Sequence, residues 1–298
     1  MLEHPQSSTI IFGFDSAWTD SPGAPGAICA IAFDAQGKAD FHEPRLVSFS
    51  QALEFIDSKR HGYAVSLVAL DQPTIVPNAT GSRPVDKVAG SLISFIGGGV
   101  QPASRSKRGM FCDDAPVWRF LTSLNAAQEP IAAQSAAQGH FIVEVFPALA
   151  LSALHPQFAE RHGAPKYNPK NRRKYRSQDW QAVAHLTAST AERLGVVGLA
   201  AWAESMADLP DPRKADQDKL DASICALVGL IWRAGAAASS AMLGDLMNGY
   251  MVTPVSDTTS KRLEAAALKR GTPFVTPNRC FEPAAPRTRV AAQTTERC

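Results

Sequence analysis

The chain of 298 residues lacks any apolar run of about 20 residues, the length that a membrane-spanning helix needs. Its first residues have neither the basic region nor the apolar region of a secretory signal, so we expect no export by that route. The formal net charge is only +2, which by itself gives no reason to expect a nucleic acid partner. These absences predict a cytoplasmic protein without membrane association, and no segment indicates an obligate protein partner.

Cysteine is scarce and scattered. The cysteines are odd in number and never form a Cys-x-x-Cys pair, so neither a disulfide framework nor a structural zinc site is expected. The five are Cys29, Cys112, Cys225, Cys280 and Cys298.

Several predicted strands end in, or contain, a carboxylate. The stretch 9–18 is a β-branched and aromatic run that stops at Asp15 and continues with small, turn-forming residues. This pattern predicts a buried strand that delivers one charged group to a sheet edge. A fully apolar segment ends in the same way at Asp71, and Glu144 lies inside another strand-like segment. Because an ionised carboxylate in apolar surroundings is costly without a partner, we expect these groups to share one site.

The order of the predicted elements indicates an α/β fold. Two hairpin connections make the first three strands antiparallel, and a helix capped by Ser50 then crosses to a fourth strand. We therefore expect a mixed five-stranded sheet flanked by helices, with the fourth and fifth strands parallel to the first. Asp15 and Asp71 would then lie at the sheet edge where α/β proteins place ligands. The predicted strands are 9–15, 27–33, 39–49, 64–70 and 141–146, and the crossover helix is 51–59.

One domain over 9–255 would hold this sheet, with helical insertions at about 72–140. The remaining residues, 256–298, would form a C-terminal helix and, after Gly271, a disordered tail rich in proline, threonine and arginine.

The segment 216–233 is the most strongly amphipathic predicted helix, and it begins with two carboxylates. Asp218 and Asp221 are three residues apart and so share one helix face in the first turn. A purely structural interpretation is that each gains about 0.3–1 kcal/mol from the helix dipole, and that Lys214 pairs with Asp218. Asp221, however, begins the face that packs on the sheet, where a carboxylate needs a partner.

Taken together, these carboxylates indicate a divalent cation. Two carboxylates about 4 Å apart repel each other by about 4 kcal/mol at a partly buried site, so gathering several without a cation would be destabilising. Mg²⁺ and Mn²⁺ take oxygen ligands of this kind, and the absence of histidine from the motifs argues against zinc. The expected metal ligands are Asp15, Asp71, Glu144 and Asp221, and the expected catalytic set adds Asp218 as a ligand or base.

A basic block over 161–176 contains two tyrosines and no acidic residue. It predicts contacts to a phosphate backbone with ring stacking, although a solvated loop is the alternative. A smaller basic patch lies near residue 107. The side chains expected to contact nucleic acid are Lys166, Lys170, Arg172, Arg173, Lys174 and Arg176, together with Arg105, Lys107 and Arg108.

Short motifs occur in a specific order between residue 10 and about residue 255. They include Gly-Phe-Asp15-Ser-Ala-Trp, Leu-Asp71-Gln-Pro-Thr, Glu144-Val-Phe-Pro, Asp221-Ala and Gly249-Tyr-Met-Val-Thr-Pro. In these motifs the chain resembles the RNase H-like superfamily, and more specifically the family called domain of unknown function 429, whose members are predicted nucleases. The resemblance implies a mixed five-stranded sheet and an acidic metal site made of Asp15, Asp71 or Glu144, and Asp221.

The expected function is therefore that of a divalent-metal-dependent nuclease or phosphodiesterase with an RNase H-like fold. One alternative is a phosphotransferase or ATPase of the actin-like branch. That alternative needs glycine-rich phosphate loops after the first and fourth strands, and the segments after Asp15 and Asp71 are poor in glycine. The other alternative is a non-catalytic nucleic-acid-binding module that retains the fold.

Overall fold

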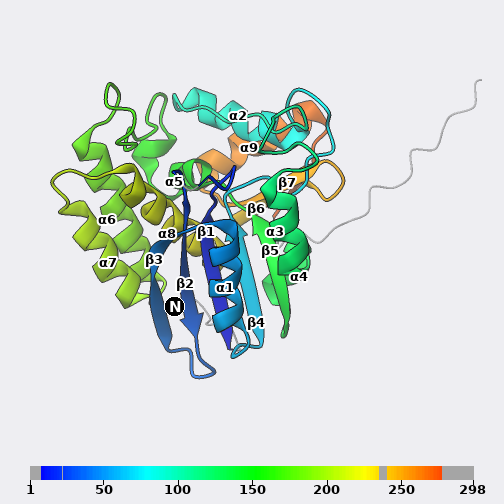
Figure 1. Ribbon diagram of the computed structural model, residues 1–298. Coiled ribbons are helices and arrows are strands. Elements are labelled where there is room, and N and C mark those ends of the chain that lie inside the picture. The colour runs from blue at the N-terminus through cyan, green and yellow to red at the C-terminus, as the bar shows by residue number, and fades with distance from the viewer. Residues whose placement is uncertain (1–7, 22, 235–239, 277–298) are drawn as a thin grey trace, which may run out of the picture.

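The computed structural model describes residues 8–21, 23–234 and 240–276, and a five-stranded sheet forms its centre (Figure 1). The strand order is β3-β2-β1-β4-β5. The pairs β1–β2 and β2–β3 are antiparallel, whereas β1–β4 and β4–β5 are parallel, which confirms the expected mixed sheet. The strands are β1 (Thr9–Asp15), β2 (Gly26–Phe33), β3 (Ala39–Val47), β4 (Val65–Leu70) and β5 (Gly139–Glu144).

Helices cover both faces of this sheet. On one face, α1 (Phe49–Arg60) and α3 (Pro116–Leu124) pack on alternate residues of β1: the Phe12 and Phe55 rings lie 6.0 Å apart, and those of Phe14 and Phe120 lie 5.4 Å apart. The opposite face carries α8 (Lys214–Arg233), with α6 (Ser177–Arg193) and α7 (Val197–Ala207) beside it. The sheet is therefore the middle of three layers.

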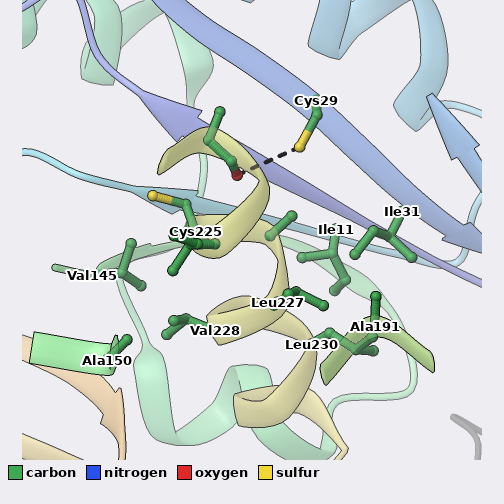
Figure 2. Close-up of a cluster of buried hydrophobic side chains, with 14 of the residues drawn as sticks. Ile11, Cys29, Ile31, Val145, Ala150, Ala191, Cys225, Leu227, Val228 and Leu230 are labelled. Carbon is green, nitrogen blue, oxygen red and sulfur yellow. Dashed lines mark hydrogen bonds between the residues drawn. The ribbon is translucent and has the colours of Figure 1, made fainter. Parts of the chain in front are cut away.

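Helix α8 crosses β1 at Gly13. A Cβ atom at this position would lie 2.0 Å from the carbonyl oxygen of Ala222 and 2.4 Å from the amide nitrogen of Ala226, so only glycine permits so close an approach. Figure 2 shows the helix lying on the sheet, with the Cys29 thiol donating to the Ala222 carbonyl oxygen at 3.4 Å. This contact fixes the middle of α8 against the carboxyl-terminal half of β1.

A second sheet of three short strands, which the sequence patterns did not predict, lies beside the first. Its order is β7-β6-β8, with β6 (Ser240–Asp245), β7 (Gly249–Pro254) and β8 (Phe274–Val275). It packs in one apolar cluster with α2 (Pro84–Phe95), α5 (Pro147–Leu154) and α9 (Asp257–Arg270). Strand β8 shows that the expectation of disorder directly after Gly271 is wrong. The rest of the predicted tail, 277–298, lies outside the described residues.

Two helix starts differ from the expected ones. Ser48, not Ser50, caps α1, because its hydroxyl accepts from the Gln51 amide while the Gln51 side chain accepts from the Ser48 amide. Helix α8 begins at Lys214, so Asp218 and Asp221 lie beyond its first turn, where the helix dipole stabilises a carboxylate less.

The remaining elements are short or connect the layers. Helix α4 (Pro130–Ser135) lies in the expected insertion, and the 3₁₀ helix η1 (Pro156–Ala159) follows α5. No helix in the described part of the chain combines the length and the apolar character that crossing a bilayer requires.

Candidate functional site

Asp15 and Asp71 lie side by side at the carboxyl ends of two neighbouring parallel strands. The Asp71 amide donates to the carbonyl oxygen of Phe14 at 2.9 Å, which continues the pairing of β1 with β4. Strand alternation places both carboxylates on the face of the sheet that α8 covers. Behind them, the Ser16 hydroxyl donates to Gln72 Oε1 at 2.5 Å and ties the two strand-end loops together. Asp15 and Asp71 therefore lie close together at the sheet edge, as expected.

Asp221 reaches the same place from α8. Its Oδ1 atom accepts from the Tyr167 hydroxyl at 2.7 Å, and its Oδ2 atom accepts from Gln217 Nε2 at 3.0 Å. Asp218 forms an ion pair with Lys214, the pairing expected at i,i+4. Both oxygens of Asp221 are thus held by neutral donors, whereas Asp218 has a cation of its own.

Burial and mutual repulsion dominate the electrostatics of this group. Burial raises the pKa of Asp15 well above its usual range, and Asp221 and Asp71 raise it further. The pKa of Asp71 is raised well above its usual range by burial and then by Asp221. Burial also raises the pKa of Asp221 to about 6, against the lowering effects of Lys214 and the Tyr167 hydrogen bond.

Lys214 is the cation that lowers the pKa of all three carboxylates. Burial lowers its own pKa, but Asp15, Asp221 and Asp218 raise it more, so the net shift is upward. Among the groups that set these pKa values, Lys214 faces four aspartate carboxylates, so negative charge is in excess there.

Glu144 raises the pKa of Asp71, but its own carboxylate is bound to an arginine. On β5 it has the same parity as Ile142, which packs in the α1 and α3 layer, so its side chain starts on the face opposite Asp15. Arg83 holds it with two hydrogen bonds, Nη2 to Oε1 at 2.5 Å and Nη1 to Oε2 at 2.8 Å. Arg83 also donates to Asp86, and its side chain is fully buried. Of the two residues expected to compete for the middle of the constellation, Asp71 is therefore the better placed.

The carboxylates do not form a complete set of metal ligands by themselves. Within the ranges that the structure describes, no three His, Cys, Asp or Glu side chains are arranged to hold a metal ion. The pKa values of Asp15 and Asp71 are nevertheless raised by burial and by neighbouring carboxylates, so a bound cation beside them would be favourable. Mg²⁺ often binds through one or two carboxylates plus waters and substrate phosphates. The donor chemistry of this pair therefore fits Mg²⁺ or Mn²⁺ that arrives with a phosphate group.

Two adjoining cavities lead to the carboxylates. One, of about 580 Å³, is lined by Asp15, Asp218, Lys170 and Lys214, among others. The other, of about 840 Å³, shares the two lysines and adds Arg172 and Arg213; we call it the cationic groove. Lys170 and Arg172 were expected to face nucleic acid, whereas Arg213 and Lys214 were not, because sequence spacing alone does not show that the start of α8 faces the basic block.

Other residues of the predicted nucleic-acid surface have structural contacts. Lys166 Nζ donates to the Gly97 carbonyl oxygen at 2.7 Å. Arg105 donates to the Val76 carbonyl oxygen at 2.9 Å and lies 4.5 Å from the centre of the Trp118 ring. Arg108, Arg173, Lys174 and Arg176 are exposed and Lys107 is half-buried, and none of these five lines the two cavities.

Tyr167 corrects the interpretation of the basic block. The sequence pattern suggested ring stacking with a base, but the tyrosine is buried and its hydroxyl is bound to Asp221. The sequence gives no signal for this position, because the apolar residues around Tyr167 come together only in the folded chain.

The family described as "Protein of unknown function (DUF429)" matches residues 13–242, a span that contains Asp15, Asp71, Tyr167, Lys214 and Asp221. The chain belongs to this family. Among curated proteins and among solved structures, no match to the chain is found. Membership in DUF429 thus agrees with the resemblance seen in the motifs, and the description of the family gives no activity.

Proposed function

We propose that this DUF429 member is a divalent-metal-dependent nuclease or phosphodiesterase of RNase H-like type. The observation that carries the proposal is the meeting of Asp15, Asp71 and Asp221 at one sheet edge, where they raise one another's pKa. Asp15 and Asp221 are buried and Asp71 is half-buried. An arrangement so costly to the free protein is expected where a bound cation later offsets the charge.

In this proposal Asp15 and Asp71 hold Mg²⁺ or Mn²⁺, and Asp221 lies beside them. When bound, such an ion supplies charge stabilisation and an activated water for phosphodiester hydrolysis. Tyr167 and Gln217 orient the Asp221 carboxylate. Asp218 keeps Lys214 at the border between the acidic site and the cationic groove, where its ammonium group attracts a phosphate.

The cationic groove supports nucleic acid as the substrate class. Lys170, Arg172, Arg213 and Lys214 line it, against a single acidic residue, Asp211. Such a surface attracts a phosphate backbone and leads it to Asp15 through the shared lysines. A cytoplasmic location is part of the proposal, and Cys29, Cys112 and Cys225, which are free thiols, support it.

The test incubates the full chain with Mg²⁺ or Mn²⁺ and labelled single-stranded, duplex and hybrid oligonucleotides. Asp15→Asn and Asp71→Asn remove one proposed ligand each without a change in size. The matched control is Asp208→Asn, at an exposed position. We expect metal-dependent cleavage, a loss of at least about 100-fold in the two site variants, and no change in the control.

Cleavage that persists in EDTA or in both site variants would overturn the proposal. Oligonucleotide binding without cleavage by the wild-type chain would favour the alternative of a binding module. Metal-dependent release of phosphate from ATP without cleavage would favour the phosphotransferase alternative.

A further inference from the structure

A third cavity shares Trp18 with the 580 Å³ cavity that contains Asp15. Its volume is about 150 Å³, and Trp18, Asp71, Val100, Gln101, Phe146 and Met251 are among its lining residues. Asp71 faces this third cavity and Asp15 faces the larger one, so the two proposed metal ligands look into adjoining spaces.

The size of the third cavity limits what can enter it. A cavity of about 150 Å³ holds one benzene ring in an engineered protein core. A single six-membered ring therefore matches this volume, and the larger fused rings of a purine match it less well. The Trp18 and Phe146 rings, with Val100 and Met251, supply the apolar surface against which a flat heterocycle packs.

The charges around the cavities fix the orientation of a nucleotide. Asp71, Asp86 and Glu144 line the small cavity, and Arg83 is the cation that neutralises the last two. A phosphate group is therefore disfavoured there. The larger cavity, which Trp18 also lines, offers Lys170 and Lys214. A nucleotide that spans both spaces places its phosphate toward the lysines and its base in the small cavity.

Trp18, which lines both cavities, is held in a fixed position. Its backbone has a φ angle of +48°, a conformation that a bulky residue rarely adopts and that the surrounding contacts must maintain. The Trp18 amide donates to the Ser16 hydroxyl at 3.4 Å, and its ring meets the Phe111 ring edge-on at 5.8 Å. A strained, fixed aromatic side chain next to a cavity is typical of a ligand-binding wall.

We propose that the cavity bounded by Trp18, Val100 and Phe146 is a base-binding subsite that accepts a pyrimidine and excludes a purine. It would hold the base next to the scissile phosphodiester bond. The assignment rests on the proposed function, because the base would belong to a nucleotide whose phosphate lies at the proposed catalytic site.

The test measures equilibrium binding of CMP, UMP, AMP and GMP to the full chain in the presence of Mg²⁺, by calorimetry. We expect the pyrimidine nucleotides to bind at least about tenfold more tightly than the purine nucleotides. Because binding is measured, the result is independent of cleavage. A wild-type chain that cleaves oligonucleotides but binds all four nucleotides equally would overturn the subsite alone, and pyrimidine preference without cleavage would support it while the proposed nuclease activity fails.

Two opposite changes at Val100 test the location. Val100→Phe fills the cavity, so pyrimidine binding should fall by about tenfold. Val100→Ala enlarges it, so the difference between pyrimidines and purines should shrink. The matched control is Val197→Phe on α7, where the side chain is 71% exposed. This control should change neither pyrimidine binding nor the difference between pyrimidines and purines. Pyrimidine binding that is unaffected by both Val100 variants would place the base elsewhere, and thermal unfolding of each variant shows whether it is folded.

Discussion

Tyr167 and Asp221 are 54 residues apart in the chain and meet in a hydrogen bond of 2.7 Å, in which the phenol donates to Oδ1. Both side chains are buried. Burial and the neighbouring Asp221 raise the pKa of Tyr167 well above its usual range, so the phenol stays protonated and remains a donor. The basic block and α8 are thus joined at the acidic site by a neutral group and not by an ion pair.

Tyr167→Phe removes this donor while it keeps the aromatic ring. The buried Asp221 carboxylate then loses one hydrogen-bond donor, and we expect no water to replace it. The free energy of unfolding should therefore fall by about 2 kcal/mol. In return, Oδ1 becomes available, so Mg²⁺ should raise the melting temperature of the variant more than that of the wild type. Thermal unfolding with and without Mg²⁺ measures both effects. Equal stability of variant and wild type would show that the hydrogen bond is not made in solution.

The raised carboxylate pKa values predict how stability depends on pH. In the unfolded chain an aspartate loses its proton near pH 4, whereas Asp221 in the fold keeps it up to about pH 6. The native state therefore binds more protons between these values, and this contribution to stability is present at low pH and lost as pH rises. The shift of about 2 units corresponds to roughly 3 kcal/mol by pH 7, and Asp15 and Asp71 act in the same direction.

His140 acts in the opposite direction, because burial lowers its pKa to about 4 and its neutral form is favoured in the fold. A comparison with Asp221→Asn separates the contribution of Asp221 from that of His140. Urea unfolding in EDTA should show the variant more stable than the wild type by a margin that is small at pH 4.5 and grows up to pH 7. A margin that stays constant with pH would contradict the burial of an ionised Asp221.

The sheet and the pair Asp15–Asp71 could be predicted because both depend on local pattern. A buried strand shows as an apolar run, and a hairpin or a helical crossover fixes the direction of the next strand. Asp221 could be predicted because it begins the packing face of a helix. Glu144 could not be assigned, since an apolar strand that contains a glutamate looks the same whether the glutamate binds a metal or an arginine. Its partner, Arg83, is 61 residues away, in the insertion.

The second sheet escaped prediction for a related reason. Strands β6 and β7 are as long as β4 and β5, but their only partner besides each other is β8, which has two residues, and the sheet depends on packing against α2 and α9. The cationic groove was only half predicted. Arg213 and Lys214 join Lys170 and Arg172 because the loop after η1 returns to the start of α8, a long-range contact that no local pattern encodes.

Arg83 is expected to be essential for stability, because it is the cation for two buried carboxylates. Arg83→Met leaves Glu144 and Asp86 without that cation, and we expect a loss of about 3–5 kcal/mol in the free energy of unfolding. Adding Glu144→Gln should recover part of the loss, since one buried charge is then removed. The control, Arg60→Gln, breaks the more exposed pair with Asp57 and should cost less than about 1 kcal/mol. Similar losses for the two arginine variants in urea unfolding would argue against a buried network.

The position of α8 on β1 determines whether the carboxylates meet, and Gly13 tests it. Gly13→Ala places a methyl group 2.0 Å from the Ala222 carbonyl oxygen, so the helix must move away from the strand. Overpacking of this kind costs about 1–3 kcal/mol or more, and the movement carries Asp221 away from Asp15. The variant should therefore unfold at lower urea concentration and gain less stability from Mg²⁺ than the wild type.

The matched control for this substitution is Gly62→Ala, because a Cβ atom at Gly62 meets no other atom within 4 Å. That variant should keep the stability and the Mg²⁺ response of the wild type. If Gly13→Ala behaved in the same way as Gly62→Ala, α8 would not lie against β1 at this distance. Asp221 would then not be held beside Asp15, and the acidic site would lose its third carboxylate.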